Sequence, residues 1–403
     1  MTESHDDQPL LISPWWDNLA TSVVEQLTLP DVHHMRESEL RDFDVIIVGA
    51  GIAGLSAAAA AAGVGAKTLV LEKAHKIGFG ATGRNAGILS AGINMPLGSL
   101  DSGSPGAALW SQTVAAASEL LSAGRDANSL LSARQTGALS LSKSASASKR
   151  LGREKRVLQA NGFDAEILTP REVSEITSGH LCLDGVDCAL WLPNDGRIQP
   201  LTLLAWMARQ ARKAGAVLVG NARVTKSKSM EATRNNWTLT LHDAQHDGLE
   251  ATGAALVRAI GPTNKPNSRI YAMAFEANLP DDFPLFWDAN PYEYYDYRPG
   301  DGRIITSGGR YGKAGARAND DKYHKRMHEA ARKWLPGLDG EPTFKWAVDL
   351  HVTADLIPCI SPLAGPRGLS VQGLGSLGVL PGIVLGREAG LALARATQSK
   401  LSV

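Results

Sequence analysis

The stretch Val45-Ile46-Ile47-Val48-Gly49-Ala50-Gly51-Ile52-Ala53-Gly54 decides the fold of this chain. Its four consecutive β-branched residues predict a buried parallel strand, and the glycines that follow have G-x-G-x-x-G spacing. A helix of small residues is predicted to begin at Leu55-Ser56 and to continue to Ala62. A second predicted strand, Thr68-Leu69-Val70-Leu71, leads into Glu72. This succession is the βαβ unit that binds dinucleotides.

The glycines and the acidic residue have separate roles in such a unit. Gly49 permits the tight turn, Gly51 lets a pyrophosphate approach the backbone, and Gly54 lets the helix pack on the strand. The N–H groups at the helix start face the phosphates. Glu72 is expected to accept a hydrogen bond from a ribose hydroxyl and to disfavour a 2′-phosphate, which predicts FAD or NAD rather than NADP. The cofactor contacts expected here are Gly49, Gly51, Ile52, Ala53, Gly54, Glu72 and Lys73.

A second glycine-rich loop follows Glu72 and narrows the choice of cofactor. It reads Gly78-Phe79-Gly80-Ala81-Thr82-Gly83-Arg84-Asn85-Ala86-Gly87. It resembles the G-x-G-A-[ST]-G-R-N-x-G loop of the D-amino-acid-oxidase-like FAD oxidoreductases, and most closely that of the γ-glutamylputrescine oxidoreductase branch. In that family the loop lies along the ribityl chain and the flavin ring. The resemblance therefore implies FAD contacts from Gly80, Ala81, Thr82, Arg84, Asn85, Ala86 and Gly87.

The resemblance extends from about Asp44 to the C-terminus. Asp195-Gly196-Arg197-Ile198-Gln199-Pro200 is similar to the family's D-G-x-I-x-P step into a helix. Val224 is placed where the family's backbone contacts adenine, and Gly261 ends a strand in A-x-G. A glycine loop near residues 373–378 is placed at the flavin pyrimidine ring, where the helix start that follows favours negative charge. Its implied cofactor contacts are Gly375, Ser376, Leu377 and Gly378.

The family implies an α/β fold with two intertwined domains. One is a Rossmann-like FAD-binding domain of the GR2 type, expected at residues 41–92, 185–263 and 345–403. The other is an interleaved α+β substrate domain built on a mixed β-sheet, expected at residues 93–184 and 264–344. Residues 1–40 are expected to form an N-terminal arm carrying Trp15 and Trp16. These tryptophans either pack against the protein's own body or contact a partner or a second copy in a homo-oligomer.

Several positions depart from relatives within the family. Leu350 falls where glycine-oxidase-like members carry an arginine for the substrate carboxylate, which favours an amine over an amino acid. Asp349 falls near the cysteine that binds FAD covalently in sarcosine-oxidase-like members, and Cys359 lies well beyond it, so we expect non-covalent FAD. Those members also use a lysine near flavin N5, and residues 304–307 contain none. Leu377 replaces a histidine of the family's G-x-G-H-G pattern.

Two residues are candidates for catalysis. Tyr297, with Arg298, matches a Tyr-Arg pair of the family, within a tyrosine-rich run whose alternation puts Tyr292 and Tyr294 on one strand face and Tyr295 and Tyr297 on the other. His351 is expected near the flavin, where it either accepts a proton or has a purely structural role. His324 and His328 are four residues apart on a predicted helix, but the charges around them predict a solvated face, and we expect no metal.

Composition restricts the class of protein further. The 403 residues carry 41 positive and 41 negative side chains, which argues against nucleic acid or an anionic membrane as a partner. The three cysteines lack metal-ligand spacing and make no disulfide framework. Residues 1–10 do not resemble a signal peptide, and no run of 18 apolar residues occurs. These features predict a cytoplasmic protein.

The leading expectation is an FAD-dependent oxidase or dehydrogenase for a primary or secondary alkylamine. Hydride transfer to flavin N5 would give an imine, which hydrolyses to an aldehyde and an amine, with oxygen or another acceptor reoxidising the flavin. An amino-acid or N-methyl-amino-acid oxidase is the alternative within enzymes. A non-catalytic flavin-binding protein that uses Trp15 and Trp16 for a partner is an alternative of another class, and a plain NAD dehydrogenase is a distant one.

Overall fold

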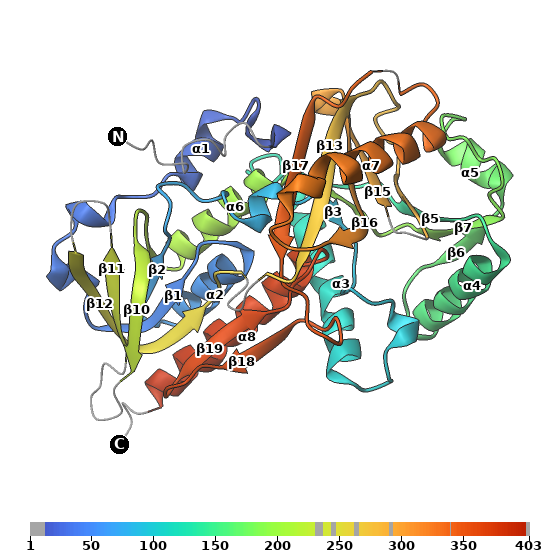
Figure 1. Ribbon diagram of the computed structural model, residues 1–403. Coiled ribbons are helices and arrows are strands. Elements are labelled where there is room, and N and C mark those ends of the chain that lie inside the picture. Colours follow the sequence, from blue (N-terminus) through green and yellow to red (C-terminus); the bar gives the residue numbers. More distant parts are fainter. Residues whose placement is uncertain are drawn as a thin grey trace.

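The computed structural model describes residues 13–229, 237–242, 247–261, 266–289, 293–338 and 340–399. These residues form two eight-stranded sheets and one three-stranded sheet. In Figure 1 the first large sheet, with β1, β2 and β12, lies at the left of the molecule, and β5, β6 and β7 of the second lie at the right. Helix α8 crosses the middle of this view, and α3 lies beside it.

The first sheet contains the strand that the apolar run 45–48 predicts. Strand β1 (Phe43–Val48) pairs in parallel with β2 (Thr68–Leu71) on one side and β12 (Asp247–Arg258) on the other. Parallel pairing continues to β9 and β19, so five strands have their carboxyl ends at one edge. The other strands are β9 (Val217–Val219), β10 (Arg223–Ser229), β11 (Trp237–His242), β18 (Cys359–Pro362) and β19 (Gly368–Gln372).

Helices of small residues pack closely on this sheet. A Cβ at Gly386 of α8 (Val379–Gln398) would lie 2.3 Å from the carbonyl oxygen of Ala53 in α2 (Ile52–Gly63), and one at Gly390 would lie 2.3 Å from that of Ala57. Because α2 and α8 approach each other this closely, only small side chains fit between them, which explains why the α2 sequence is mostly alanine. The helix begins three residues before the predicted Leu55, because Gly51 already serves as its extended N-cap.

The second sheet is mixed, as the sequence predicted. Its order is β17-β13-β16-β15-β14-β5-β7-β6, and all pairs are antiparallel except β14 with β5. The strands are β5 (Ala138–Ser142), β6 (Glu166–Leu168), β7 (Cys188–Leu192), β13 (Ser268–Glu276), β14 (Leu285–Asp288), β15 (Glu293–Arg298), β16 (Arg303–Gly312) and β17 (Phe344–Leu350). A small sheet of β3 (Ile88–Leu89), β8 (Gly196–Ile198) and β4 (Ala133–Gln135) joins the two halves.

The other helices agree with the sequence patterns. The sequence pattern predicts helices over residues 111–123, 142–159 and 201–214, and the structure has α3 (Pro105–Gly124), α4 (Ala145–Ala160) and α6 (Pro200–Lys213) at these places. The remaining α-helices are α1 (Thr21–Leu27), α5 (Pro170–Ile176) and α7 (Asp320–Trp334), and short 3-10 turns lie at Pro14–Trp16, Val32–His34, Glu37–Leu40, Ala81–Arg84, Leu97–Ser99, Pro299–Asp301 and Arg317–Asn319. Within the described ranges, none of these helices has the length and apolar character of a membrane span.

Two strands of the second sheet lie in ranges that were predicted for the FAD-binding domain. Strand β7 lies in the second sheet, although residues 185–263 were assigned to the FAD-binding domain, because it pairs with β5 and β6. Strand β17 also lies in the second sheet, although residues 345–403 were assigned to the first domain, because it pairs antiparallel with β13. The chain therefore leaves the second sheet after Leu192 and after Leu350.

The described part of the N-terminal arm packs on the body of the protein. Helix α1 lies against α6, and the Trp15 side chain is only 2% exposed. Trp16 packs on Phe79 with 5.4 Å between ring centroids. Of the two expectations for this pair, packing against the protein's own chain is the one seen.

Candidate cofactor and substrate site

The glycine turn after β1 cannot accommodate larger residues at two of its positions. Gly49 has φ of +101°, and a Cβ there would lie 2.5 Å from the carbonyl oxygen of Ala259. A Cβ at Gly54 would lie 1.8 Å from the carbonyl oxygen of Gly49. Gly51 differs, because the nearest atom to a Cβ there is Thr82 Oγ1, at 3.3 Å. Gly49 and Gly54 are thus required by the protein itself, whereas the hydrogen of Gly51 leaves room at the start of α2 for a ligand to approach.

Glu72 holds the turn from the end of β2. Its Oε2 accepts a hydrogen bond from the Ala50 N–H at 2.8 Å, and its Oε1 accepts one from the Ala74 N–H at 3.2 Å. The carboxylate therefore lies beside the glycine turn, as a ribose acceptor must. The next residue, Lys73, is exposed.

The other residues predicted to contact the adenosine half converge on the same edge. The Ala222 N–H donates to the carbonyl of Glu72 at 2.8 Å, which brings the start of β10, and with it Val224, beside the end of β2. The Ala259 N–H donates to the carbonyl of Val48 at 2.9 Å, so Gly261 follows β12 past the glycine turn. The structure brings these segments together at the carboxyl edge where doubly wound sheets bind dinucleotides.

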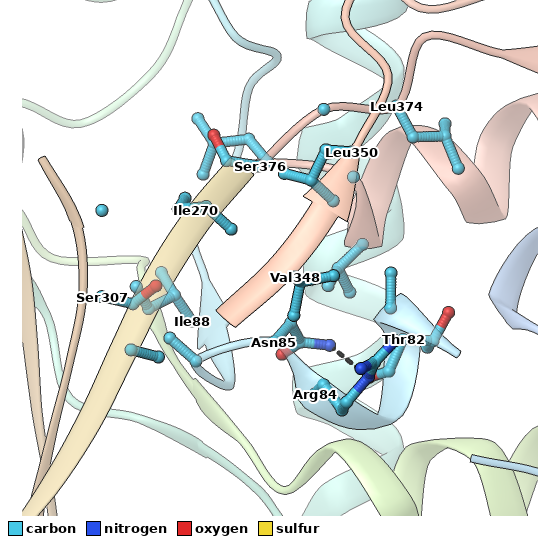
Figure 2. A pocket seen from close by; sticks show the side chains of 18 of the residues that line it. Thr82, Arg84, Asn85, Ile88, Ile270, Ser307, Val348, Leu350, Leu374 and Ser376 are labelled. Atoms are coloured by element: carbon cyan, nitrogen blue, oxygen red, sulfur yellow. Dashed lines mark hydrogen bonds between the residues drawn. The ribbon is translucent and has the colours of Figure 1, made fainter. Parts of the chain in front are cut away.

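The second glycine-rich loop joins the first through Thr82. The Ile52 N–H at the start of α2 donates to Thr82 Oγ1 at 3.3 Å, which joins the two glycine-rich segments. Asn85 then braces the second loop internally, because its Nδ2 donates to the Thr82 carbonyl and its Oδ1 accepts from the Gly87 N–H at 2.7 Å. Figure 2 shows Thr82, Arg84 and Asn85 side by side, with the Asn85 to Thr82 hydrogen bond dashed.

Three side chains from distant segments donate hydrogen bonds to the carbonyls of this loop. They are Trp346 Nε1 to Arg84 at 2.8 Å, Trp15 Nε1 to Asn85 at 2.8 Å, and Arg298 Nη2 to Gly87 at 2.9 Å and to Ala86 at 3.3 Å. The donors come from β17, the N-terminal arm and the end of β15. Four successive carbonyls are thereby satisfied by protein groups, which fixes the orientation of the peptide units between them.

Arg298 is held in place by a buried ion pair. Its guanidinium contacts Asp296, which also pairs with Arg197 at 3.1 Å, and all three residues are buried. Asp296 lowers the cost of burying Arg298, although burial still lowers the pKa of this arginine to about 10. A Cβ at Gly87, where φ is +75°, would lie 2.0 Å from Arg298 Nη2. Only a glycine at position 87 therefore leaves room for Arg298 to contact the loop.

A third loop, at residues 374–378, precedes α8 and is held by Asn94. Asn94 Nδ2 donates to the Leu374 carbonyl at 3.2 Å, and its Oδ1 accepts from the Leu377 N–H at 3.2 Å. Gly375 has φ of +62°, and Gly378 is the N-cap of α8. The positive end of this helix dipole therefore faces the region of residues 375–378, which suits a ligand that gains negative charge. Sequence reasoning did not identify Asn94, because its partners lie some 280 residues away.

An open cleft with about 970 Å³ of empty space lies where these loops meet the second sheet (Figure 2). Its loop residues are Ile52, Ala81, Thr82, Arg84, Asn85, Ala86, Ile88, Ser90, Leu374, Gly375, Ser376, Leu377, Gly378, Val379 and Leu380. The sheet contributes Ile270, Ala272, Tyr294, Ser307, Gly308, Trp346, Val348 and Leu350. Predicted cofactor residues from three separate loops thus line one cleft.

The wall contributed by the second sheet is mainly apolar. Ile270, Val348 and Leu350 face the cleft, and the hydroxyl groups on this wall are those of Tyr294 and Ser307. Leu350, which was expected in place of a carboxylate-binding arginine, is among the lining residues. The cleft contains one arginine, Arg84, whose pKa is lowered by burial.

The two candidate catalytic residues do not line the cleft. Tyr297 is 4% exposed and packs within a separate core on the other face of the sheet. Tyr294, three residues earlier on β15, points to the opposite face and lines the cleft instead. His351 follows β17 with its Nδ1 buried and without a hydrogen-bond partner in the described structure. Tyr292, the other tyrosine predicted on the face of Tyr294, lies outside the described residues.

The histidines at positions 324 and 328 lie near backbone carbonyls, and His324 is buried rather than on the solvated face that the sequence predicted. His324 Nε2 lies 3.1 Å from the Trp346 carbonyl, and His328 Nε2 lies 3.2 Å from the Gly340 carbonyl. Burial lowers the pKa of His324. Among the residues that the structure describes, no three His, Cys, Asp or Glu side chains are grouped as a metal site.

Comparison with known proteins identifies the class of fold. The family profile described as FAD dependent oxidoreductase matches residues 44–390. Glycine oxidase from Geobacillus kaustophilus is similar at a TM-score of 0.72 and 20% identity, over 89% of this chain and 95% of that one. L-proline dehydrogenase from P. horikoshii is similar at 0.73 and 18% identity, over 88% and 94%.

Iminodiacetate oxidase from Chelativorans sp. BNC1 is a further similar structure, with a TM-score of 0.69 and 20% identity over 86% of this chain and 95% of that one. At these identities the likeness establishes the fold alone. No curated protein sequence matches the chain. The expected closeness to the γ-glutamylputrescine oxidoreductase branch is not confirmed by these comparisons.

Proposed function

The chain belongs to the DAO family of FAD-dependent oxidoreductases, and we propose that within this family it oxidises a primary or secondary alkylamine. FAD is its cofactor, and the three loops fit it. Gly51 leaves the space a pyrophosphate needs, Glu72 places a carboxylate for a ribose hydroxyl, and the start of α8 supports negative charge near Gly375.

The observation that carries the proposal is the character of the substrate wall. Leu350 lies in the cleft with Val348 and Ile270, so a substrate carboxylate would meet aliphatic side chains there. Burying a carboxylate without a charged or hydrogen-bonding partner is costly, whereas an alkyl group gains from the same surface. The wall therefore favours an amine whose substituents are apolar.

When bound, FAD accepts a hydride from the carbon next to the amine nitrogen. The chain's own part is to orient the amine and to exclude water from it. Tyr294 and Ser307 supply hydroxyls on the sheet side, within reach of a polar group that enters the cleft, while the aliphatic residues position the alkyl part. The imine then hydrolyses to an aldehyde and an amine once water returns.

We propose that FAD is bound without a covalent link to the protein. Cys182, Cys188 and Cys359 all lie in the described ranges, and none of them lines the cleft. Cys359 begins β18, at the edge of the first sheet. Denaturation of the yellow protein should therefore release all of its flavin into the supernatant.

One observation favours an amino-acid or N-methyl-amino-acid substrate as the second candidate. Arg84 lines the cleft and could pair with a carboxylate if FAD leaves its guanidinium free. Several proteins of similar fold are named for such substrates, including glycine and proline. Arg84, however, lies within the loop matched to the family's flavin-binding motif, which supports a role toward the cofactor.

The deciding experiment is an anaerobic titration of the purified holoenzyme with matched amines and amino acids, followed in the visible flavin band. N-methylbutylamine and N-methylnorvaline make one such pair, because they differ by a carboxylate. Bleaching by the amine alone supports the proposal. Bleaching by the amino acid alone replaces it with the second candidate, and no bleaching by any member of the panel favours a flavoprotein without this activity.

A further inference from the structure

A buried carboxyl group lies directly behind one of the cleft residues. Ser90, which follows β3, lines the cleft, and its Oγ donates a hydrogen bond to Asp195 Oδ2 at 2.6 Å. The other oxygen, Oδ1, accepts from the Ala91 N–H at 3.4 Å. Asp195 itself is 6% exposed and is not a lining residue. Its carboxyl group is therefore connected to the cleft through one hydroxyl.

The surroundings hold this carboxyl group firmly. Asp195 lies in the turn between β7 and β8, and its backbone carbonyl accepts from the N–H groups of Thr136 at 3.2 Å and Gly137 at 2.9 Å. Ser90 and Asp195 thus lie on segments joined by the small β3-β8-β4 sheet. The pair is placed by secondary structure on both sides, which keeps the hydroxyl directed at the carboxylate.

On the basis of the proposed function, we propose that Ser90 and Asp195 together accept the proton that an ammonium substrate must lose before it is oxidised. An alkylammonium ion has no lone pair to assist departure of the hydride, so the nitrogen must first be neutral. In the step, the substrate N–H⁺ proton passes to Ser90 Oγ while the Ser90 hydroxyl proton passes to Asp195 Oδ2. The products are a neutral amine, an unchanged serine and a neutral aspartic acid.

The charges around Asp195 suit this task. The charged side chains on the strands around Asp195 are Arg197 on β8, Arg134 on β4 and Glu166 on β6, and Asp164 lies just before β6. Arg197 is paired with Asp296, and Asp164 accepts from Asn194 at 2.9 Å. Burial raises the pKa of Asp195 to about 7, against the lowering effect of its hydrogen bonds from Ser90 and Ala91. A carboxylate with this pKa can accept a proton near neutral pH and release it again between turnovers.

The first test compares pH profiles of kcat/KM for an amine that reduces the wild-type flavin. In the wild type, we expect a limb in which activity rises with pH through about 7. In D195N this limb should disappear, and the rate should follow ionisation of the free amine near pH 10, the range of an alkylammonium group. At pH 7.5 the loss in kcat/KM should be about a hundredfold, as for removal of a general base.

The second test uses Ser90 and has a conservative control. S90A should show the same displaced limb as D195N, whereas S90T, which keeps a hydroxyl, should restore the limb near pH 7. The FAD content and visible spectrum of each variant report whether the cofactor site is intact. The infrared difference spectrum of wild type minus D195N gives a readout that does not depend on turnover. Its carboxyl band should titrate near pH 7.

The outcomes separate this inference from the proposed function. If no amine reduces the wild-type flavin, both are overturned. If an amine does reduce it and D195N and S90A keep the wild-type pH profile with FAD bound, the proton-accepting pair is wrong while the amine activity stands. Should D195N fail to fold, the S90A and S90T comparison decides the question alone.

Discussion

Trp15 donates its indole N–H to the carbonyl oxygen of Asn85 at 2.8 Å. This hydrogen bond ties a residue that precedes the family match at 44–390 to the second glycine-rich loop, which lies within that match. The Trp15 ring also lies 4.8 Å from the guanidinium carbon of Arg298, which donates to the next two carbonyls of the loop. The N-terminal arm is therefore a structural part of the candidate cofactor site.

Replacing Trp15 by phenylalanine should weaken FAD binding without unfolding the protein. The ring and its contact with Arg298 are largely kept, but the Asn85 carbonyl loses its donor. A hydrogen bond of this kind contributes about 0.5–1.5 kcal/mol, so the Kd for FAD should rise roughly two- to tenfold. Titration of the apoprotein with FAD, followed by flavin fluorescence, measures it. W16F keeps the packing on Phe79 and should bind as the wild type does; equal effects in both variants would contradict the argument.

The space at Gly51 gives a second prediction. An alanine there meets only Thr82 Oγ1 at 3.3 Å and has an ordinary φ of −74°, so the apoprotein should keep its thermal midpoint. The added methyl group should instead obstruct the pyrophosphate and raise the Kd for FAD at least tenfold. The matched control is G63A in the same helix, where a Cβ meets nothing within 4 Å. Unchanged FAD affinity in G51A would place the cofactor elsewhere.

Gly87 should differ from Gly51 in its effect on the apoprotein, because a side chain at position 87 would collide with the protein itself. With φ of +75° and a Cβ only 2.0 Å from Arg298 Nη2, G87A should destabilise the apoprotein by roughly 2 kcal/mol or more as well as weaken FAD binding. Urea unfolding of the apoprotein measures this difference. G80A, in the same loop with nothing within 4 Å of its Cβ, is the control and should unfold as the wild type does.

Local sequence patterns predicted the FAD-binding part of the fold, because the residues that specify it lie close together in the sequence. Gly49, Gly51, Gly54 and Glu72 lie within one βαβ unit, and their spacing alone specifies the turn and the two strands. The start of α2 was displaced by three residues, since a glycine at the N-cap looks no different in sequence from one in the turn. The mixed character of the second sheet followed from the family resemblance.

Features that depend on pairing between distant strands were predicted less well. Strands β7 and β17 are short apolar runs whose sheet depends on pairing with distant partners, so the sequence did not predict that both belong to the second sheet. Alternation along β15 separates Tyr297 from Tyr294 but cannot say which of the two strand faces meets the cleft, and in the structure it is Tyr294 that lines the cleft. Asn94 gave no local signal, and the sequence singled out Trp15 without indicating its hydrogen bond to Asn85.

Restoring an arginine at position 350 should change the class of substrate. Leu350 lines the cleft near the end of β17, and a guanidinium there could form charge-assisted hydrogen bonds with a substrate carboxylate. Such contacts contribute about 1.5–3 kcal/mol, so kcat/KM for an N-methyl amino acid should rise at least tenfold in L350R, while that for the matched amine falls. Anaerobic stopped-flow reduction measures both. L350M keeps the apolar wall and should retain the amine preference; an L350R enzyme with that same preference would show that position 350 does not select the substrate.

The buried carboxyl group of Asp195 should also make the stability of the protein depend on pH. Its pKa is about 7 in the folded protein and close to 3.8 when unfolded, so the folded state binds the proton more tightly. The contribution of Asp195 to the free energy of unfolding is therefore fully present below about pH 4. It is lost as pH rises to about 7, because the ionised carboxylate is poorly solvated when buried. Between pH 5 and pH 8 the wild type should lose roughly 2–3 kcal/mol relative to D195N, whose side chain does not ionise.

Urea unfolding of both proteins at the two pH values, with equal FAD, gives this difference. Subtracting D195N cancels the contribution of other buried carboxyl groups such as Glu293, whose pKa is also raised by burial. Parallel loss of stability in both proteins would mean that Asp195 ionises as freely in the folded chain as in the unfolded one, and it could not then hold a proton near neutral pH.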